Sequence, residues 1–346
     1  MGQGGLHNRV PGVLHEIGAV GIVSCGLEAI PAYDMRILVL GGTGLTGPFA
    51  VRRLCGLGYE VTVFHRGDHE QNLPGEVQHI HGSLADPPPM LRHHVADVVV
   101  DMWAMNAAHS ARFLDLFRSA GRAVVISSCD VYRGYGRLQR LESGSVDAGP
   151  LTEDSLLRES RYPYRGRAAA PVEDQDSYDK ILVEEMLRAQ TELPVTILRY
   201  PAVYGPHDLH RFGSWVRQMS SGAGEIRMQE DFAAWRWTHG FAEDVAEAVV
   251  LAVKDVRAAG RTYNVGEAAT PTWAERVEGL GRAIGWTGRV LPVAPAELPK
   301  DQRLPHDFAH HLVVDSSRVR EELGYREVAP YEEGLRRTAE WEQRSA

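Results

Sequence analysis

The pattern of hydrophobic positions begins with a short apolar run at residues 35–40, Met-Arg-Ile-Leu-Val-Leu. A cluster of glycines follows this run directly. Beyond the glycines, apolar residues recur at helical spacing at Phe49, Ala50, Val51, Leu54 and Leu57. A short β-favouring run predicts a strand and a three-to-four-residue repeat predicts a helix, so this stretch is expected to form a strand, a glycine turn and a helix.

The same alternation of strand and helix patterns continues along most of the chain. Further strands are predicted at 60–64, 77–80, 97–102, 123–126, 195–198 and 262–265. Helices are predicted between them at 107–120, 177–190 and 244–256. This rhythm is typical of an α/β fold with a doubly wound, parallel (Rossmann-type) sheet, in which ligands bind at the carboxyl ends of the strands.

The pattern divides the chain into three parts. Residues 1–34 show little periodicity, and a poorly ordered extension is favoured over a signal peptide because acidic residues bracket the apolar run there. Residues 35–200, completed by parts of 240–266, form the predicted Rossmann-type domain. Residues 201–346 form a smaller mixed part, largely helical, which is expected to bind the substrate.

Residues 133–175 interrupt the alternation, because they are rich in glycine, arginine, proline and charged residues and have no sustained period. They are predicted to form a long excursion, and a lid over the site is one interpretation. In the C-terminal part, helices are predicted at 272–284, 316–323 and 331–342. Asp315 or Ser316 is the predicted N-cap of the second of these helices.

Composition narrows the classes of function. The 346 residues carry a net charge of -9 and no basic block, which argues against a dedicated nucleic-acid surface. The uncharged run Ile17–Leu27 is too short to cross a membrane, so no membrane association is expected. Three cysteines without paired spacing suggest neither a disulfide framework nor zinc, and a cytoplasmic location fits. No metal is predicted, because the following histidines show no ligand spacing: His207, His210, His239, His310 and His311.

The glycine cluster after the first strand has the chemistry of a dinucleotide site. Gly41, Gly44 and Gly47 fit the spacing G-x-x-G-x-x-G, and Gly42, Gly44 and Gly47 fit G-x-G-x-x-G. Glycines allow a tight turn and a close approach to a pyrophosphate, and the helix that follows offers free N–H groups at its positive end. Residues 35–200 are therefore expected to bind NAD or NADP.

The end of the second strand distinguishes between these two cofactors. The strand runs into His65-Arg66-Gly67, and the first acidic residue, Asp68, comes only after the glycine. An acidic residue here pairs with the ribose 2′-hydroxyl of NAD, whereas an arginine accommodates the 2′-phosphate of NADP. Arg66 therefore favours NADP, NAD remains an alternative, and an exposed arginine in a turn is the competing interpretation.

Several motifs in order resemble the extended short-chain dehydrogenases/reductases of the NAD-dependent epimerase/dehydratase group. The matching stretches are Gly-Gly-Thr-Gly-Leu-Thr-Gly47, Ser127-Ser-Cys-Asp-Val-Tyr132, Arg199-Tyr-Pro-Ala-Val-Tyr-Gly-Pro206, Glu243-Asp-Val-Ala246, Tyr263-Asn-Val-Gly266 and Asp315-Ser-Ser-Arg-Val-Arg-Glu-Glu-Leu-Gly-Tyr325. They cover residues 35 to about 330. Jointly they are more specific for the fold than for the reaction.

The resemblance implies catalytic roles for Ser128 and Lys180. Family members place a serine or threonine four residues before the tyrosine of the Val-Tyr turn, which here is Ser128. They also use a tyrosine four residues before a lysine, because i and i+4 share a helix face and the lysine charge can lower the tyrosine pKa. Lys180 matches this lysine, where it is expected to face the cofactor and hold its ribose hydroxyls.

The usual tyrosine is missing, because the residue four before Lys180 is Asp176. Tyr178 is only two residues before Lys180 and cannot share its helix face unless the helix begins later. Asp176 is therefore either a catalytic acid or the partner of Lys180 in an i,i+4 ion pair. Tyr178, and Tyr162 or Tyr164 from the excursion, are the other candidate proton donors. Tyr178 is expected to reach Ser128 only if the helix starts at or after it.

The resemblance also implies cofactor contacts, position by position. They comprise Gly41, Thr43, Gly44, Leu45 and Gly47 in the glycine turn, His65 and Arg66 after the second strand, Ser83 and Leu84 after the third, Met102, Trp103 and Ala104 after the fourth, and Lys180 and Pro201. Ser83 replaces the aspartate usual at the adenine contact.

One departure concerns the substrate. Members that bind UDP-sugars tend to carry Arg-Asp ahead of the late helix, whereas those positions here hold Trp237 and Thr238, with Arg236 one residue early. The stretch Trp235-Arg-Trp-Thr-His239 predicts an aromatic wall, which is either core packing or part of a substrate site. A nucleotide-sugar substrate is thereby less favoured.

These observations support two hypotheses of different classes. The first is an NAD(P)-dependent oxidoreductase or epimerase/dehydratase-like enzyme, which acts by hydride transfer on a small hydroxy or carbonyl compound, including sugar-derived ones. The second is a non-catalytic NAD(P)-binding regulator or scaffold, with an RNA-associated protein as one form. The missing tyrosine supports the second, while the acidic charge opposes its RNA form. The expected partner is a small-molecule substrate, and a homodimer is compatible with the sequence.

Overall fold

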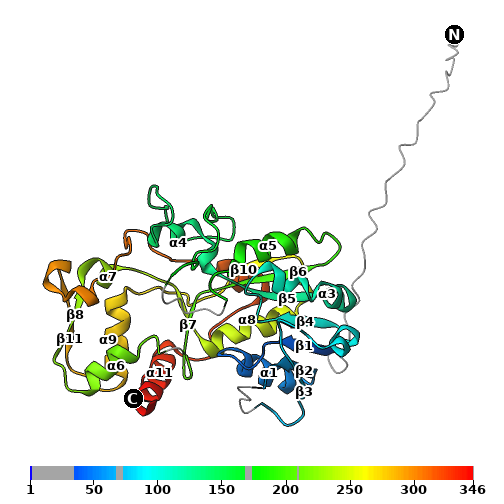
Figure 1. The fold of residues 1–346 in the computed structure, drawn as a ribbon, viewed down its shortest axis with the longest axis horizontal. Coiled ribbons are helices and arrows are strands. Elements are labelled where there is room, and N and C mark those ends of the chain that lie inside the picture. Colours follow the sequence, from blue (N-terminus) through cyan, green and yellow to red (C-terminus); the bar gives the residue numbers. More distant parts are fainter. Residues whose placement is uncertain (2–34, 68–72, 168–173, 209, 346) are drawn as a thin grey trace.

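A seven-stranded parallel sheet forms the centre of the structure (Figure 1), which we describe from a computed structural model for residue 1 and residues 35–67, 73–167, 174–208 and 210–345. The strand order is β10-β6-β5-β4-β1-β2-β3. The strands are β1 (Arg36–Leu40), β2 (Glu60–His65), β3 (Gln78–His81), β4 (Val98–Asp101), β5 (Ala123–Ser128), β6 (Val195–Tyr200) and β10 (Thr262–Asn264). Every neighbouring pair is parallel, as the alternation of strand and helix patterns predicts.

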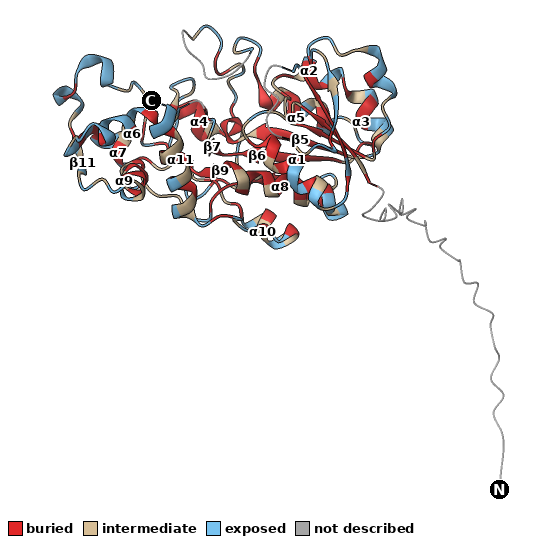
Figure 2. Cartoon of the chain, turned by 90° about the horizontal axis from the view of Figure 1, so that it is seen from below, coloured by how far each residue is buried: buried red, intermediate tan, exposed pale blue. Residues whose placement is uncertain are grey.

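Helices cover both faces of this sheet and bury its apolar strands (Figure 2). On one face, α1 (Gly47–Gly56), α8 (Ala242–Lys254) and α10 (Ser317–Leu323) share a core with β1 and β2. On the other face, α3 (Leu114–Ala120) and α5 (Lys180–Arg188) share a second core with β4 and β6. The predicted doubly wound α/β fold is therefore confirmed.

The C-terminal part lies beside the sheet (Figure 1), and its core, rich in aromatic side chains, also takes in Tyr164 of the excursion and Ile181 of α5. Its helices are α6 (Gly213–Ser220), α7 (Glu230–Ala234), α9 (Trp273–Ala283) and α11 (Tyr331–Ser345). Two short parallel pairs complete it, β7 (Ala202–Tyr204) with β9 (His239–Phe241) and β8 (Glu225–Gln229) with β11 (Arg289–Val293). Because α8, β10 and α10 return to the sheet, the two parts are joined by several chain crossings.

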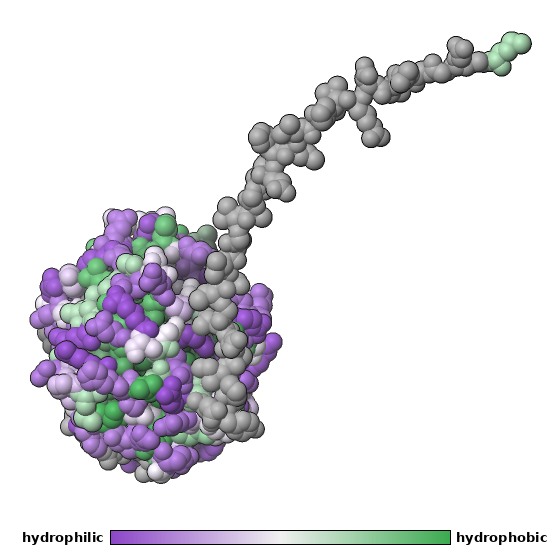
Figure 3. All heavy atoms as spheres, turned by 90° about the vertical axis from the view of Figure 1, so that its right-hand side faces the viewer, coloured by the Kyte–Doolittle hydropathy of each residue, from purple (hydrophilic) through white to green (hydrophobic). Residues whose placement is uncertain are grey.

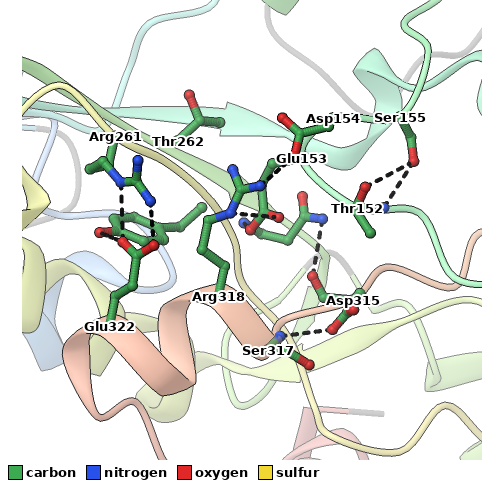
Figure 4. A network of polar contacts seen from close by, with 12 residues as sticks. Thr152, Glu153, Asp154, Ser155, Arg261, Thr262, Asp315, Ser317, Arg318 and Glu322 are labelled. Atoms are coloured by element: carbon green, nitrogen blue, oxygen red, sulfur yellow. Dashed lines mark hydrogen bonds and ion pairs between the residues drawn. The ribbon is translucent and has the colours of Figure 1, made fainter.

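A polar network fastens α10 and residues 152–155 to the edge of the sheet (Figure 4). Arg318 on α10 lies 3.5 Å from a Glu153 oxygen and 2.5 Å from an Asp154 oxygen. Glu153 in turn accepts the backbone N–H of Asn264 on β10 at 2.8 Å. A second ion pair joins Arg261 to Glu322 on α10. The excursion is thus held against the sheet at its base.

Several predicted element boundaries are wrong. The helix expected at 107–120 is interrupted, forming α2 (Ala107–Ala111) and α3. The excursion 133–175 contains a short helix, α4 (Arg133–Leu138), which its composition did not indicate. Ser316 is the N-cap of α10, yet its side chain makes no capping bond, and the Asp315 carboxylate accepts the Ser317 N–H instead.

The hypothesis of a poorly ordered N-terminal extension concerns residues that lie outside the described part of the chain. Among the described residues, no helix is both long and apolar enough to cross a membrane. The face that carries the β1–β3 side of the sheet is mostly hydrophilic, with hydrophobic residues scattered across it (Figure 3).

One buried ion pair locks α5 onto the centre of the sheet. Arg199 on β6 donates through Nε and Nη2 to the two oxygens of Glu184, at 2.9 and 2.7 Å, and both side chains are 1% exposed. Ser127 on β5 donates to Glu184 at 2.6 Å. Burial alone would raise the pKa of Glu184, but the Arg199 hydrogen bonds and charge lower it. Glu184 is therefore ionised and stabilised by its partners.

We expect Glu184→Ala to reduce the free energy of unfolding by about 3–5 kcal/mol, because it leaves the Arg199 charge buried without a partner. Urea denaturation of wild type and variant measures this difference. Glu185→Ala is the matched control, because its ion pair with Arg161 is half-exposed, and it should cost about 0–1 kcal/mol. Equal losses in both variants would contradict the role assigned to Glu184.

Candidate active site

The glycine turn after β1 has the geometry of a phosphate-binding loop. Gly41 adopts φ +79°, and a Cβ there would lie 3.0 Å from that of Trp103. A Cβ at Gly47 would lie 2.2 Å from the Gly42 carbonyl oxygen, so α1 approaches the turn as closely as glycine allows. Gly44 is different, since a Cβ there meets nothing within 4 Å. Its exposed backbone leaves room for a ligand.

The N-terminus of α1 is open to an anion. Its N-cap, Thr46, makes no side-chain capping bond, and no acidic residue occupies the first turn. Unsatisfied N–H groups at a helix N-terminus attract phosphate, and the helix dipole adds to this attraction. The glycine turn and α1 together therefore fit the pyrophosphate of a dinucleotide.

The predicted cofactor contacts converge at the same edge of the sheet. Gly41 N donates to the Phe64 carbonyl oxygen at 2.9 Å, and Leu84 lies beside Gly41. Trp103 stacks on His109 with ring centroids 4.0 Å apart. The glycine turn and the neighbouring strand ends also carry the other predicted contacts: Thr43, Leu45, Met102, Ala104 and Pro201. Ser83 is exposed and accepts the Ala85 N–H, which leaves its hydroxyl hydrogen for a ligand.

Three histidines at the end of β2 and β3 come together, which sequence analysis missed. The register places His65 opposite His81, and the ligand atoms of His65, His79 and His81 lie within 4.8 Å of one another. His65 Nδ1 accepts the Gly67 N–H, so a neutral His65 carries its proton on Nε2, which lies 2.8 Å from His79 Nδ1. A metal ion on His65 Nε2 would displace that proton, and we propose no metal site here. Arg66 is exposed beside this cluster.

Helix α5 begins at Lys180, three residues later than predicted. Asp179 is its N-cap, with Oδ1 accepting the Ile181 N–H at 3.0 Å. The expectation that Asp176 shares a helix face with Lys180 is therefore wrong. Asp176 is exposed, lies before the helix, and accepts the Gly166 N–H at 3.0 Å. Tyr178 also precedes the helix, and it is buried with the cavity-lining residues.

A chain of hydroxyl and carboxyl groups surrounds Tyr178. Its hydroxyl donates to Asp130 Oδ2 at 2.7 Å, and Tyr164 donates to the same oxygen at 3.2 Å. Tyr135 donates to the Tyr164 hydroxyl at 2.8 Å. Asp130 Oδ1 is buried and has no hydrogen-bond partner among the described residues. Burial raises the pKa of Asp130, so this carboxyl group can take up a proton more readily than usual.

Ser128 and Tyr178 are brought together as the predicted catalytic pair. Burial, and then the charge of Asp130, raises the pKa of Tyr178 well above its ordinary value. A hydrogen-bond interaction with Ser128 opposes this increase in the Tyr178 pKa. Tyr178 is therefore a neutral acid near neutral pH, and both hydroxyl groups line the same cavity.

Lys180 lies behind this pair. Its Nζ donates to the backbone oxygens of Ala104 and Ile126, at 2.8 and 3.0 Å, and lies 5.7 Å from the centre of the Tyr178 ring. Burial lowers the pKa of Lys180 to about 8. Two of its three N–H groups are thus used by the protein, so Lys180 binds the ends of β4 and β5 in addition to any role toward ribose.

The cavity beside Ser128 and Tyr178 has a volume of about 550 Å³. Aromatic side chains line much of it: Phe232, Trp235, Trp237, Trp273 and Phe308. The aromatic wall predicted at Trp235 and Trp237 is therefore part of the cavity lining. Tyr164 enters it from the excursion, whereas Tyr162 lies under the Arg165 guanidinium, 3.6 Å from its carbon to the ring centre. Asp130 and Arg211 also line it, and sequence analysis gave neither a role.

A larger cavity, of about 800 Å³, lies elsewhere, around Asp244, Glu267 and Glu327. Its acidic side chains already have partners, because Glu267 pairs with Arg276 and Glu327 with Arg320. Asp244 caps the backbone N–H groups of Val328 and Ala329. This cavity contains none of the catalytic candidates, so the smaller one is the candidate active site.

Several known proteins are similar to this chain in sequence or in fold. The NAD dependent epimerase/dehydratase family matches residues 37–266. A 2′-dehydrokanamycin reductase from Streptomyces kanamyceticus is 26% identical over 285 residues, covering 79% of this chain and 73% of that protein.

Two solved structures share the fold. The UDP-glucose-4-epimerase of Stenotrophomonas maltophila, with bound NAD and formylated UDP-arabinopyranose, has a TM-score of 0.67 at 20% identity and covers 90% of this chain and 100% of that one. The dTDP-glucose 4,6-dehydratase of Bacillus anthracis, in complex with NAD, has a TM-score of 0.66 at 20% identity. The match covers 90% of this chain and 97% of that one.

Proposed function

The chain belongs to the NAD dependent epimerase/dehydratase family, and on this basis we propose that it is an NAD(P)-dependent oxidoreductase that interconverts a hydroxyl and a carbonyl group on a small substrate. The observation that carries this proposal is the meeting of Ser128 and Tyr178 in one cavity, with Lys180 behind them. Lys180 joins the backbone after β4 to β5, and β4 lies next to β1, whose carboxyl end carries the glycine turn beside Trp103.

The residues at the strand ends fit the cofactor. The open backbone at Gly44 and the uncapped N-terminus of α1 would hold the pyrophosphate. Trp103 and the backbone at Ala104 would flank the rest of the dinucleotide, beside Lys180. When bound, the nicotinamide supplies or accepts a hydride.

The protein supplies the proton in this proposal. Ser128 and Tyr178 would both hydrogen-bond the substrate oxygen, and Tyr178, kept neutral by burial and by Asp130, would donate its proton as that oxygen gains charge. Asp130, whose own pKa is raised, would then take up a proton that enters from solvent and pass it to the Tyr178 oxygen, returning to its charged form. Tyr164 and Tyr135 extend the hydrogen-bonded chain behind Asp130. The arrangement favours reduction of a carbonyl, and the reductase relative supports that direction.

The main support for a non-catalytic regulator was the absence of a tyrosine at position 176. Since α5 begins at Lys180, Tyr178 supplies a buried hydroxyl group beside Ser128 without that spacing. The enzyme is therefore the hypothesis that the geometry supports better.

Tyr178→Phe should reduce turnover by about 10²- to 10⁴-fold, because it removes the proposed acid while keeping the ring. A screen of sugar-derived carbonyl compounds with NADPH and NADH, followed by the loss of absorbance at 340 nm, gives the rate. Tyr162→Phe is the control, because that ring lies outside the cavity lining. Unchanged turnover in Tyr178→Phe would remove Tyr178 from the mechanism.

Asp130→Asn should move the pH dependence of alcohol oxidation to lower pH. The Asp130 charge raises the pKa of Tyr178, so its removal lets Tyr178 ionise and act as a base at a lower pH. The measurement is kcat/KM for oxidation between pH 6 and 10. Asp176→Asn, at an exposed carboxylate, should leave the profile unchanged. A shift toward higher pH would contradict the coupling of Asp130 to Tyr178.

We further propose that the cofactor is NADP, because Arg66 is exposed at the end of β2, where a 2′-phosphate would lie. NAD is the cofactor in the two solved epimerase and dehydratase structures, so the preference needs a direct test. Arg66→Asp should weaken NADPH binding by roughly tenfold or more, the loss of one charge-assisted contact, with little change for NADH. Fluorescence titration measures the affinities for NADPH and NADH. Arg92→Asp, at another exposed arginine, is the control. Equal losses for NADPH and NADH would show that Arg66 does not contact the 2′-phosphate.

A further inference from the structure

Arg211 places a guanidinium group at the wall of the candidate active site. The residue follows β7, and its side chain lines the cavity together with Ser128 and Tyr178. The guanidinium carbon lies 5.3 Å from the centre of the Trp237 ring. Cations attract the face of an aromatic ring at this range, so Trp237 contributes to fixing the direction of the group.

This guanidinium has few partners. Nε donates to the Val203 carbonyl oxygen at 3.3 Å, and among the described residues the two terminal nitrogens have no acceptor and no ion pair. Asp208 is on the same turn, and its charge acts on the guanidinium, but its Oδ1 accepts the backbone N–H of Arg211 and forms no ion pair with the side chain among the described residues. Burial lowers the pKa of Arg211, which shows that the charge is held at a cost. A partly buried cation with free donors is expected to find its acceptor in a ligand.

The other side chains that line the cavity do not neutralise the charge of Arg211. Its second arginine, Arg167, donates to the Gln139 side chain and forms no ion pair among the described residues. The carboxylate in the lining, Asp130, already accepts hydrogen bonds from Tyr178 and Tyr164. The Arg158 charge acts on Asp130 as well. The Arg211 guanidinium therefore keeps donors available to a ligand, while Asp130 is engaged with the proton chain.

The aromatic lining suits the remainder of such a ligand. Trp237 and Trp235 lie with ring centroids 5.3 Å apart, and Phe308 lies 5.5 Å from Trp235. These rings offer apolar faces to the C–H groups of a small carbon skeleton. Specific binding in such a cavity depends on a few placed polar groups, of which Ser128, Tyr178 and Arg211 are available.

We propose that Arg211 binds an anionic oxygen group on the substrate, so that the substrate class is a hydroxy or keto acid or its phosphate ester, including sugar acids. This inference rests on the proposed function, since it assigns the substrate of that same site. A guanidinium donates two parallel hydrogen bonds to a carboxylate or a phosphate, which gives both affinity and orientation. The anionic group would then fix which carbon lies beside Ser128 and Tyr178.

The test compares probes that differ in charge. Quenching of the tryptophans that line the cavity reports binding of D-glucuronate, D-glucose 6-phosphate, D-glucose and D-glucosamine to the full-length protein, with and without saturating NADP⁺. We expect either anionic probe to bind at least about tenfold more tightly than glucose, with glucosamine weakest. The difference in affinity between glucuronate and glucose 6-phosphate distinguishes a carboxylate site from a phosphate site.

Variants then assign the preference to Arg211. Arg211→Gln should bring anionic and neutral probes to within about threefold of each other, and Arg211→Lys should recover part of the preference, because it restores the charge but not the paired donors. Arg217→Gln, an exposed arginine on α6, should leave the preference intact. Melting temperatures of the variants exclude unfolding as the cause of any loss.

Each result is decisive for the inference. A wild-type preference for an anion that Arg211→Gln removes and Arg211→Lys partly restores supports it. Equal quenching by glucuronate and glucose, absence of quenching by every probe, or a preference that Arg211→Gln leaves intact overturns it. The cofactor titration is separate, so NADP⁺ and NAD⁺ that both fail to bind would overturn the proposed function, whatever the probes show.

Discussion

The buried carboxylate of Asp179 determines the geometry of the site. Its Oδ1 caps α5 at Ile181, and its Oδ2 accepts the backbone N–H of Tyr162 at 2.7 Å. The Arg158 guanidinium lies 3.6 Å from Oδ1, and both side chains are fully buried. One acidic side chain therefore fixes the first turn of α5 and holds the excursion against it. A helix that begins here turns Lys180 toward the sheet and leaves Tyr178 outside the helical repeat.

That starting point explains how Tyr178, at an unusual position, reaches the cavity. In a helix that began earlier, Tyr178 would point about 200° away from Lys180. Because Tyr178 instead precedes the helix, its backbone is free of the helical repeat, and its hydroxyl reaches Asp130. The same excursion supplies Tyr164 to that carboxyl group. Local backbone geometry thus brings a tyrosine hydroxyl into the cavity without the usual spacing, which a motif cannot express.

The sequence predicted the sheet well and the site only partly. Apolar runs such as residues 36–40 and 60–65 identify buried parallel strands without reference to anything distant, and the glycines mark the turn that follows. The start of α5 was missed because it depends on Arg158 and Tyr162, which lie in an aperiodic segment. The contacts of His65 with His79 and His81 arise from strand register, and those of Asp130 from the folding of the excursion. Asp130 is only two residues from Ser128 in the chain, and that proximity was the one signal in the sequence that Asp130 belongs to the site.

The charges of the cavity suggest how one fold can host different substrates. The residues proposed for proton transfer lie at the end of the sheet and on a helix that covers it, since Ser128 ends β5 and Lys180 begins α5. The groups that would select the substrate come from elsewhere: Arg211 follows β7, and Trp237 precedes β9. The two sets meet in the aromatic core, which also holds Tyr178 and Ile181, whereas Glu184 and Arg199 are not among the residues that line the cavity. The substrate-facing side chains can therefore change without removing the buried Glu184–Arg199 pair. In the proposed function, proton transfer and recognition of substrate charge then depend on different side chains, and a relative that keeps the first set need not share the second.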